Sequence, residues 1–591
     1  MEQLKFLSCC LSRSMSNMSE EPINKDDASG IPLPMNNLVT PLLTDLYQLT
    51  MAYGYWKNGK HNDQAVFELF FRKNPFKGSF TIFCGIDQVI PFVHHFKFTE
   101  SDISYLKSTP GLQHCEEEFF TYLSNLDCSE VQLQALDQGC IAFPRVPLIV
   151  VSGPLVVCQL LETTLLNLVN FPSLLATNAA RMVVAARGQH STIKIHNRVP
   201  ACVEFGLRRA QGPDGGFSAS KYCLVGGFVG TSNVLAGKLL GVAISGTQAH
   251  AFVQSYTSLD EVKDMRLKIK SPEGSSSGNG ISSGSSNAVE GSTVELLQLV
   301  LKYRQKLGGD WLKTNDGELA AFIAYAIGFP HAFLALIDTY NTIKSGLKNF
   351  ILVSLALHEC GYQSRGIRLD SGDLAALSQE CRKMFEEIAE KYNLPSFLDF
   401  AIVASNDINE ATLLELNSKG HAITVFGIGT NLVTCQAQPA LGCVFKLVQL
   451  NGKPRIKLSS DKVKVLIPGQ KRAFRLFNAE GTPEMDLMVE IREDIPKAGV
   501  EYTCYNPFTD DAPLKFTPAR VEELLHTVWN KKDGACRKIL SLEEAQANVF
   551  QQIKSLNPEM LRPSDPLMIQ VKTSKKLHDD LHELWVSNKS L

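Results

Sequence analysis

Charged side chains cluster in one short segment near the middle of the chain. Arg368, Asp370 and Asp373 fall within six residues, directly after an apolar segment typical of a buried strand. A guanidinium can bind a carboxylate or a phosphate, and paired carboxylates can bind ribose hydroxyls or a Mg²⁺ ion that carries pyrophosphate. The structural alternative is that these acids cap a helix. From this segment alone both interpretations stay open.

Further polar residues follow the next two apolar segments. Ser405 and Asn406 come after one of them, and we assign them to substrate binding, with a helix cap as the alternative. Gly427, Gly429 and Thr430 come at the end of the other, where backbone N–H groups and a hydroxyl could hold a phosphate. A glycine pair of this kind fits an ordinary tight turn equally well.

Outside this region the candidate residues are more scattered. His250 lies three residues after Thr247, and a lone histidine is more often structural than catalytic. Tyr47 and Phe205 could stack on a planar ring, although aromatic residues usually belong to a core. Arg208 could hold phosphate oxygens or lie in a solvated surface pair.

The elements that position these residues alternate between strand and helix patterns. Residues 366–430 predict strand, helix, strand, helix and strand, which makes two consecutive βαβ units. Ligands bind at the carboxyl ends of parallel strands, so we predict a (β/α) barrel with its active face there. Residues 241–247 predict an earlier strand of the same barrel that brings Thr247 and His250 to that face.

Composition separates other segments from this barrel. Residues 1–38 lack periodicity and predict a disordered arm, and residues 271–292, of which fourteen are Ser or Gly, predict a flexible surface insertion. After residue 442 the pattern becomes antiparallel, with a hairpin turn at Asn451 and Gly452.

Charge and cysteine usage exclude several classes of protein. The 58 basic and 61 acidic residues nearly cancel, so no positive field would hold a nucleic acid or an anionic membrane. The 15 cysteines include no Cys-x-x-Cys pair, which favours reduced thiols in a cytosolic protein. The apolar stretch 319–336 is interrupted by Gly328 and Pro330, so we predict a buried helix pair and no membrane span.

Five motifs in the same order resemble the nicotinate phosphoribosyltransferase family of type II phosphoribosyltransferases. They are Pro-Leu-Leu-Thr-Asp-Leu-Tyr-Gln at 41–48, Glu-Phe-Gly-Leu-Arg-Arg-Ala-Gln-Gly at 204–212, Thr-Gln-Ala-His at 247–250, Arg-Leu-Asp-Ser-Gly-Asp at 368–373 and Gly-Ile-Gly-Thr at 427–430. Each motif alone is modest, but the ordered set is specific, and the resemblance runs from about residue 39 to near the carboxyl terminus.

The resemblance implies an α/β fold, in which an irregular (β/α) barrel joins an α+β domain built from both ends of the chain. On this basis we expect an α+β domain at residues 39–165, a barrel at 166–440, and a segment at 441–591 that packs with the first domain. It also implies a homodimer with active sites at the subunit interface.

The resemblance further assigns roles to single residues. His250 matches a histidine that ATP transiently phosphorylates. Tyr47, Thr247 and Arg368 match nicotinate-contacting positions, and Thr430 matches a phosphoribosyl pyrophosphate position. Phe205 would form one slice of an aromatic sandwich around the pyridine, with Tyr47 as the other slice, supplied by the partner subunit.

The implied reaction is displacement of pyrophosphate from ribose C1 by the pyridine nitrogen, with ATP as co-substrate and Mg²⁺ or Mn²⁺ as cofactor. We assign Asp370 and Asp373 to the metal, and Asp370, Arg368 and His250 to catalysis. Nicotinate is expected rather than nicotinamide, because Arg368 offers a fork for a carboxylate and residues 231–233 are neutral. Two alternatives remain: a retired relative that acts as a binding subunit, and an enzyme that uses nicotinamide or quinolinate.

Overall fold

The computed structural model describes most of the chain. The described residues are 31–188, 195, 198–270, 292–458, 464–509, 511–530 and 532–589. The predicted insertion at 271–292, except residue 292, and most of the predicted arm at 1–38 lie outside them. Of the arm, residues 31–38 are described, and there Met35 N donates to Gln88 Oε1 at 3.3 Å and Asn36 Nδ2 to Asp214 Oδ1 at 2.8 Å.

A parallel sheet carries the βαβ region. Its five strands lie in the order β6-β12-β11-β10-β9, and each neighbouring pair is parallel. The strands are β6 (Ala201–Glu204), β9 (Leu334–Leu336), β10 (Gly366–Leu369), β11 (Ala401–Ala404) and β12 (Val425–Ile428). The connecting helices are α13 (Leu347–Glu359), α14 (Leu374–Tyr392) and α15 (Glu410–Lys419). The two predicted βαβ units are therefore confirmed.

Beyond β6, within the described residues, this sheet continues as single bridges from Glu204 to Thr231 and from Thr231 to Ile244. The strand predicted at 241–247 is reduced to the parallel bridge between Ile244 and Thr231. Gly241 and Gly246 bound this segment, and glycine weakens extended pairing. In the described residues no pairing joins β9 to Ile244. The α/β class holds, while the hydrogen-bonded sheet is open and not a closed barrel.

A second, seven-stranded sheet joins both ends of the chain. Its order is β14-β13-β1-β5-β3-β20-β21. The strands are β1 (Gln64–Phe71), β3 (Gln132–Ala135), β5 (Ile149–Pro154), β13 (Cys443–Leu450), β14 (Lys453–Pro454), β20 (His526–Asn530) and β21 (Gly534–Ala535). The predicted hairpin lies between β13 and β14, where Asn451 and Gly452 both have positive φ, 49° and 74°. A two-residue turn of this form matches the twist of the strands it joins.

A four-stranded sheet in the order β19-β15-β16-β22 completes the carboxyl-terminal region. The strands are β15 (Lys471–Phe477), β16 (Pro483–Glu490), β19 (Arg520–Glu523) and β22 (Gln570–Thr573). It is tied to the seven-stranded sheet by a fully buried ion pair, in which Lys471 Nζ donates to Glu68 Oε1 at 2.6 Å. Residues 403 positions apart in sequence therefore share one core.

The remaining elements are mostly helices that cover these sheets. The helices are α2 (Leu46–Lys57), α3 (Ile86–His94), α4 (Glu100–Ser108), α5 (Glu117–Asn125), α6 (Leu155–Leu160), α7 (Glu162–Arg187), α8 (Gly212–Val225), α9 (Val234–Leu240), α10 (His250–Gln254), α11 (Leu296–Leu307), α12 (Asp316–Gly328), α16 (Thr430–Thr434), α17 (Leu542–Ser555) and α18 (Lys575–Lys589). The small strands are β2 (Thr81–Ile82), β4 (Ile141–Ala142), β7 (Arg266–Lys268), β8 (Thr293–Glu295), β17 (Tyr502–Cys504) and β18 (Leu514–Phe516).

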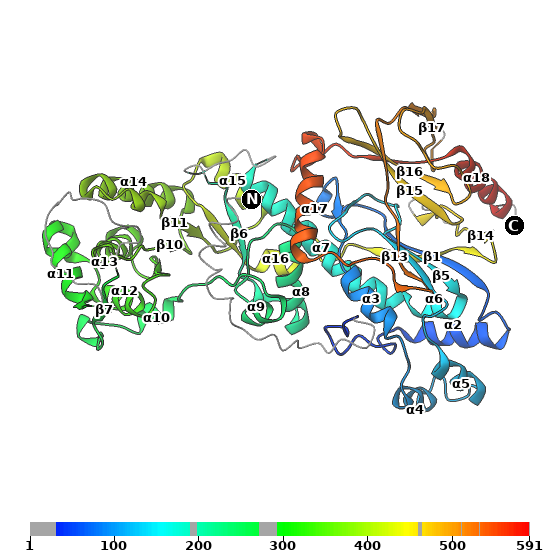
Figure 1. Cartoon of the computed structure of the whole chain (residues 1–591), viewed down its shortest axis with the longest axis horizontal. Coiled ribbons are helices and arrows are strands. Elements are labelled where there is room, and N and C mark those ends of the chain that lie inside the picture. The colour runs from blue at the N-terminus through cyan, green and yellow to red at the C-terminus, as the bar shows by residue number, and fades with distance from the viewer. Residues whose placement is uncertain are drawn as a thin grey trace, which may run out of the picture.

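The molecule is elongated, with the two kinds of sheet toward opposite ends. Figure 1 shows β10 and β11 with α11 to α14 at one end, and β1, β13, β15 and β16 at the other. Helices α7, α8 and α17 lie between them (Figure 1). The parallel strands extend from that end to the middle, where β6 and α16 lie beside α7, α8 and α17 (Figure 1).

The apolar stretch 319–336 is not a helix pair. Its first part lies in α12, but Leu334–Leu336 form the edge strand β9. A short apolar run does not by itself distinguish strand from buried helix. Among the described residues, one helical stretch, Leu155–Arg187, is long and apolar enough to cross a membrane, and 61% of its apolar window is buried inside the protein.

Candidate active site

Parallel pairing brings the ends of five strands to one edge of the sheet. Phe205 follows β6, Gly429 follows β12, Ser405 follows β11, Asp370 follows β10, and Asp338 lies two residues past β9. Because neighbouring strands run in the same direction, these residues lie along one edge of the sheet although they are far apart in sequence. Three of these five residues were predicted to act together from the chain positions of 366–430.

Arg368 is the centre of this group. Its Nε donates to Ser405 Oγ at 2.8 Å, one Nη to Asp370 Oδ1 at 2.9 Å, and the other Nη lies 3.5 Å from Thr247 Oγ1. Ser405 Oγ also donates to Asp370 Oδ1. The guanidinium is mostly buried and held in one orientation, which is the arrangement that bidentate recognition of a planar anion requires.

The carboxylate that holds Arg368 is ionised over a wide pH range. Burial acts to raise the pKa of Asp370, but the hydrogen bond from Ser405 and the charge of Arg368 outweigh burial, so the pKa lies below its ordinary value. Asp370 therefore stays negative at neutral pH and keeps the guanidinium compensated.

An aromatic ring faces the guanidinium. The Arg368 guanidinium carbon lies 5.5 Å from the centre of the Phe205 ring. The ring packs directly against Gly427, where any side chain would clash with it, because a Cβ there would lie 2.5 Å from Phe205 Cδ2. Glu204, fully buried before Phe205, accepts from Gly206 N, from Thr231 Oγ1 and, at 3.0 Å, from Ser220 Oγ. The ring and the cation together offer a surface suited to a planar anionic ligand.

His250 lies at the start of α10 on the same edge. Its Nδ1 is 3.0 Å from Thr339 Oγ1, and its Nε2 is 3.7 Å from Asp370 Oδ2 and 4.0 Å from Asp338 Oδ1. Asp338 in turn accepts from Asp370 N at 2.9 Å and from Ser371 Oγ at 2.6 Å. A partly exposed imidazole between two carboxylates is well placed to accept and release a charged group.

Asp338 and Thr339 were missed by reasoning from the sequence. The signal was present, because an apolar run followed by Asp and Thr repeats the pattern seen after β10 and β11. It was hidden because the run 334–336 was assigned to a helix. Once β9 is recognised as a strand, its position beside β10 brings Asp338 to the site.

Known proteins resemble this chain over most of its length. Three family profiles match the chain: the nicotinate phosphoribosyltransferase (NAPRTase) N-terminal domain at residues 42–170, the NAPRTase family at 201–479, and the NAPRTase C-terminal domain at 470–581. The nicotinate phosphoribosyltransferase of Dictyostelium discoideum is 47% identical over 562 residues, which cover 94% of this chain and 90% of that protein. Nicotinate phosphoribosyltransferase 1 of Arabidopsis thaliana is 48% identical, covering 94% and 95%.

The chain belongs to the nicotinate phosphoribosyltransferase family. A solved structure supports the same assignment, the crystal structure of human nicotinic acid phosphoribosyltransferase, which is 40% identical and covers 92% of this chain and 99% of that chain. The TM-score is 0.77, so the likeness extends to the arrangement of the domains. The fold predicted from the family resemblance is confirmed at this level.

Other predicted site residues of this family member have different surroundings. Asp373 caps helix α14, where its side chain accepts from Ala376 N at 3.1 Å. The structural alternative, a helix cap, is therefore the role that this side chain has here. Its predicted contact with a metal would have to replace that hydrogen bond. Arg208 is exposed on the turn after Phe205, and Thr430 is exposed as the first residue of α16.

The turn after β11 is strained. Asn406 and Asp407 both have positive φ, 87° and 50°, and neither is a glycine. Backbone conformations of this kind cost free energy, although Asn and Asp adopt them more readily than other residues, and they cluster at active sites as well as in turns. Asn406 is exposed beside Ser405, so it is available to a ligand at the strand edge.

Tyr47 lies far from the other residues within one chain. It belongs to α2, where its hydroxyl donates to Glu162 Oε1 at 3.3 Å and its side chain is about half exposed. Figure 1 shows α2 and β10 toward opposite ends of the molecule. Tyr47 therefore does not complete the site of its own chain.

In the described part of the chain, no group of three or more His, Cys, Asp or Glu side chains is arranged to hold a metal ion. Two carboxylate oxygens do face His250: Asp370 Oδ2 and Asp338 Oδ1, of which the latter is buried and has no hydrogen-bond partner among these residues. This donor set fits a magnesium ion that takes most of its ligands from a pyrophosphate and from water.

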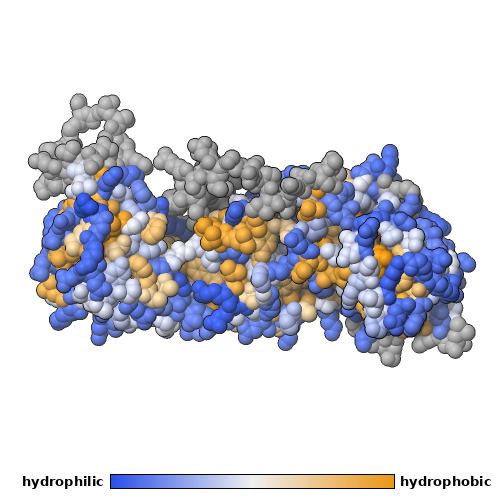
Figure 2. Space-filling model, turned by 90° about the horizontal axis from the view of Figure 1, so that it is seen from below, coloured by the Kyte–Doolittle hydropathy of each residue, from blue (hydrophilic) through white to orange (hydrophobic). Residues whose placement is uncertain are grey.

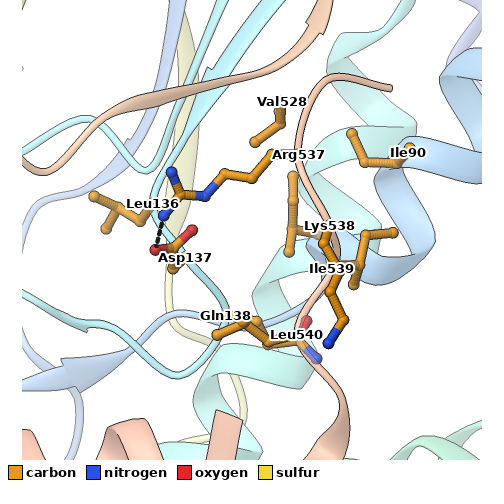
Figure 3. A pocket seen from close by; sticks show the side chains of 10 residues that line it. Ile90, Leu136, Asp137, Gln138, Val528, Arg537, Lys538, Ile539 and Leu540 are labelled. Carbon is orange, nitrogen blue, oxygen red and sulfur yellow. Dashed lines mark hydrogen bonds and ion pairs between the residues drawn. The ribbon is translucent and has the colours of Figure 1, made fainter. Parts of the chain in front are cut away.

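Two cavities lie away from the strand edge. One is bordered by Ile90, Gln138 and Leu540, and Figure 3 shows Arg537 and Asp137 pointing toward each other beside it, with an ion pair of 2.6 Å. Its volume of about 20 Å³ has room for little more than a water molecule. The other, of about 630 Å³, lies between the β13–β14 turn and α18.

Proposed function

We propose that this chain is an active nicotinate phosphoribosyltransferase. It joins nicotinate to phosphoribosyl pyrophosphate with hydrolysis of ATP, and the products are nicotinate mononucleotide, pyrophosphate, ADP and phosphate. The observation that carries the proposal is the Arg368 group, in which a fixed guanidinium stands beside the Phe205 ring and the Thr247 hydroxyl. A pyridine ring with a carboxylate needs an aromatic face and a cationic fork at this spacing.

The site favours an acid over an amide. Arg368 supplies donors only, so a ligand carboxylate is satisfied while a carboxamide NH₂ group would face a cation. Thr231 and Asn233, which are neutral, have their side chains engaged with Glu204 and with the start of α9. The neutral residues at 231–233 are thus part of the scaffold that holds Phe205, and no exposed acid repels nicotinate there.

The transfer itself needs positioning and charge compensation. The bond between ribose C1 and the pyrophosphate oxygen breaks, and a bond from C1 to the pyridine nitrogen forms, through a transition state with positive charge on the sugar. We assign Asp370, Ser405 and Asn406 to the ribose hydroxyls, and Gly429 and Thr430 to the 5′-phosphate. Bound magnesium would supply charge neutralisation of the leaving pyrophosphate.

His250 is the residue proposed to couple ATP. Its Nδ1 is engaged by Thr339, which leaves Nε2 facing two carboxylates at 3.7 and 4.0 Å. Transfer of the γ-phosphoryl group to the ring would add negative charge beside Asp338 and Asp370. Water then removes the phosphoryl group as free phosphate, and the histidine is regenerated.

We further propose a homodimer in which Tyr47 of one subunit stacks on the nicotinate held by Phe205 of the other. Tyr47 is half exposed, and its helix α2 lies toward the opposite end of the molecule from β10 (Figure 1). Apolar surface suited to subunit contact is present near the site, where Val234 and Leu235 of α9 are exposed. Figure 2 shows hydrophobic side chains at the middle of the face seen from below.

The activity is tested with the purified full-length protein, labelled nicotinate, phosphoribosyl pyrophosphate and Mg²⁺, with and without ATP. We expect nicotinate mononucleotide in both reactions and a higher yield with ATP. Nicotinamide and quinolinate serve as competing substrates. Product from either in preference to nicotinate would contradict the proposed specificity, and no product from any of the three would favour a retired binding subunit.

The role of His250 is tested by His250→Ala. This variant should lose ATP hydrolysis and keep a slow transfer that is independent of ATP. Undiminished coupling would contradict the assignment. The shared site is tested by mixing Tyr47→Ala with His250→Ala under conditions that exchange subunits. Each heterodimer contains one complete site, so it should combine ATP coupling with a low nicotinate KM, which neither parent does.

A further inference from the structure

A buried acid lies behind the His250 region and has no part in the chemistry described so far. Glu318, in the first turn of α12, is 0% exposed. Its Oε2 accepts from Ser345 Oγ at 2.5 Å and from Asn349 Nδ2 at 3.0 Å. Its Oε1 has no hydrogen-bond partner among the described residues. A buried carboxylate in this state is costly and calls for an explanation.

One partner of Glu318, Ser345, belongs to the segment that faces His250, and the other, Asn349, lies in the first turn of α13. Residues 337–346 begin with Ile337, pass through Asp338 and Thr339, and end in the single π-helical turn η7 (Thr342–Gly346). A Cβ on Gly346 would lie 1.9 Å from Ile337 O, so the two ends of this loop are in close backbone contact. Turns of π-helix are rare and occur frequently at functional sites.

The loop is fixed at two points. At its start, Asp338 accepts from Asp370 N and Ser371 Oγ. At its end, Ser345 donates to Glu318 and accepts from Asn315 N at 3.0 Å. Between these points lies Thr339, which holds His250 Nδ1. The contact between Ser345 and Glu318 therefore helps to fix the orientation of the His250 imidazole through Thr339.

Helix α12 also contacts the helix that carries His250. The rings of Phe252 in α10 and Tyr325 in α12 lie 5.7 Å apart. A Cβ on Gly317, the neighbour of Glu318, would lie 2.3 Å from Tyr256 O, so the start of α12 is pressed against the chain that follows α10. Helix α12 thus contacts α10, which begins with His250, and it also holds the 337–346 loop through Glu318.

We propose that Glu318 is a positioning residue for ATP coupling, which holds the 337–346 loop so that Thr339 and Asp338 address His250. The inference rests on the proposed role of His250 in ATP coupling. It goes beyond that role, because Glu318 touches no substrate and acts only through Ser345 and Asn349. Loss of the contact should release the loop and impair phosphoryl transfer, while binding of nicotinate at Arg368 continues.

The test compares Glu318→Ala with Glu318→Gln and Ser345→Ala in the full chain. The matched control is Asp316→Ala, in the same helical turn, where the carboxylate is half exposed and pairs with Arg304 at 2.7 Å. Two properties are measured: hydrogen exchange at residues 338–346 and 250–254, and the stimulation by ATP of nicotinate mononucleotide formation. The KM for nicotinate without ATP is measured alongside.

For Glu318→Ala and Ser345→Ala we expect faster exchange in both segments and roughly tenfold weaker stimulation by ATP, with the nicotinate KM changed by no more than about twofold. Glu318→Gln keeps an acceptor for Ser345, so its hydrogen exchange and its stimulation by ATP should stay close to those of the wild-type protein. Asp316→Ala should change neither.

Several outcomes would overturn the inference. The first is unchanged hydrogen exchange in Glu318→Ala, and the second is faster exchange with undiminished stimulation by ATP. The others are faster exchange in Glu318→Gln, or an effect of Asp316→Ala as large as that of Glu318→Ala. If the wild-type protein forms product but shows no stimulation by ATP, the proposed coupling fails and the functional part of this inference fails with it. Hydrogen exchange then still decides whether Glu318 holds the loop.

Discussion

At the scale of single residues, the site depends on side chains that are held before any ligand arrives. Arg368 has three partners, on three different segments of the chain, and its carboxylate partner Asp370 is kept ionised by Ser405 and by Arg368 itself. A guanidinium fixed in this way loses little conformational entropy when it binds an anion.

Arg368→Lys tests whether the fork or only the charge is needed. Lysine keeps the positive charge but cannot contact Ser405, Asp370 and a ligand carboxylate in one plane. Loss of charge-assisted hydrogen bonds of about 1.5–3 kcal/mol should raise the nicotinate KM roughly tenfold to a hundredfold, with a smaller change in the KM for phosphoribosyl pyrophosphate. Steady-state kinetics with each substrate varied in turn measure both. Equal effects on the two KM values would argue against a nicotinate contact.

Glu318 gives a prediction about pH. Burial raises the pKa of Glu318 from 4.5 to about 7, hydrogen bonds from Ser345 and Asn349 offset part of this effect, and the charge of Asp338 adds to it. Because the folded-state pKa is the higher one, the stabilising contribution of Glu318 is complete below pH 4.5 and is lost as the pH rises through 7.

Glu318→Gln removes this titration. The stability of the wild-type protein relative to Glu318→Gln should therefore fall between pH 5 and pH 8, by on the order of 3 kcal/mol. Urea unfolding of both proteins at the two pH values measures the difference. A difference that does not depend on pH would show that Glu318 titrates at the same pH in the folded and unfolded chain.

At the scale of elements, the site is made by the neighbourhood of parallel strands. β6 lies beside β12, so Phe205 at the end of one strand meets Gly427 at the end of the other. Gly427 lies within β12 rather than in the turn after it, and its contact is with the aromatic ring. Because Gly427 has no side chain, the Phe205 ring can pack against it. The motif had predicted a phosphate contact for this glycine.

Gly427→Ala should displace the Phe205 ring. The added Cβ would lie 2.5 Å from Phe205 Cδ2, and overpacking of this kind costs about 1–3 kcal/mol. If the ring moves to relieve the contact, the nicotinate KM should rise roughly tenfold. Gly328→Ala is the control, because nothing lies within 4 Å of its added Cβ. An unchanged KM in Gly427→Ala would mean that Phe205 does not hold nicotinate in this position.

At the scale of the whole molecule, the two ends of the chain fold together. β1 pairs with β13 on one side and β5 on the other, and β20 pairs with β3. The buried pair of Lys471 and Glu68 adds the four-stranded sheet to this core. The family's N-terminal and C-terminal profiles therefore cover two parts of one structural unit.

Lys471→Met should expose how strongly this unit depends on the ion pair. The substitution leaves Glu68 buried without its partner, which is expected to cost about 3–5 kcal/mol of unfolding free energy. Lys515→Ala, which removes an exposed pair with Glu501, should cost less than about 1 kcal/mol. Denaturant unfolding measures both. Adding Glu68→Leu to Lys471→Met should recover much of the loss, and no recovery would assign the cost to packing instead of charge.

Parts of the fold could be predicted from the sequence, and others could not. The strand and helix pattern at 366–430 is strong because each element is amphipathic or buried over its whole length and is bounded by turn residues. The strand predicted at 241–247 is reduced to one parallel bridge, and 334–336 is a strand where a helix was predicted. One is rich in glycine, and the other is only three residues long, so local pattern gave no basis for deciding their state.

The sequence by itself determined which side chains carry chemistry and the family to which they point, because residue types and motif order are local properties. Only the tertiary structure decided which of them meet. Sheet order brought Asp338 and Phe205 to Arg368, turned Asp373 into a helix cap, and left Tyr47 at the far end of the chain. The physical reason is that hydrogen bonding between strands distant in sequence sets these distances, and no spacing along the chain encodes that pairing.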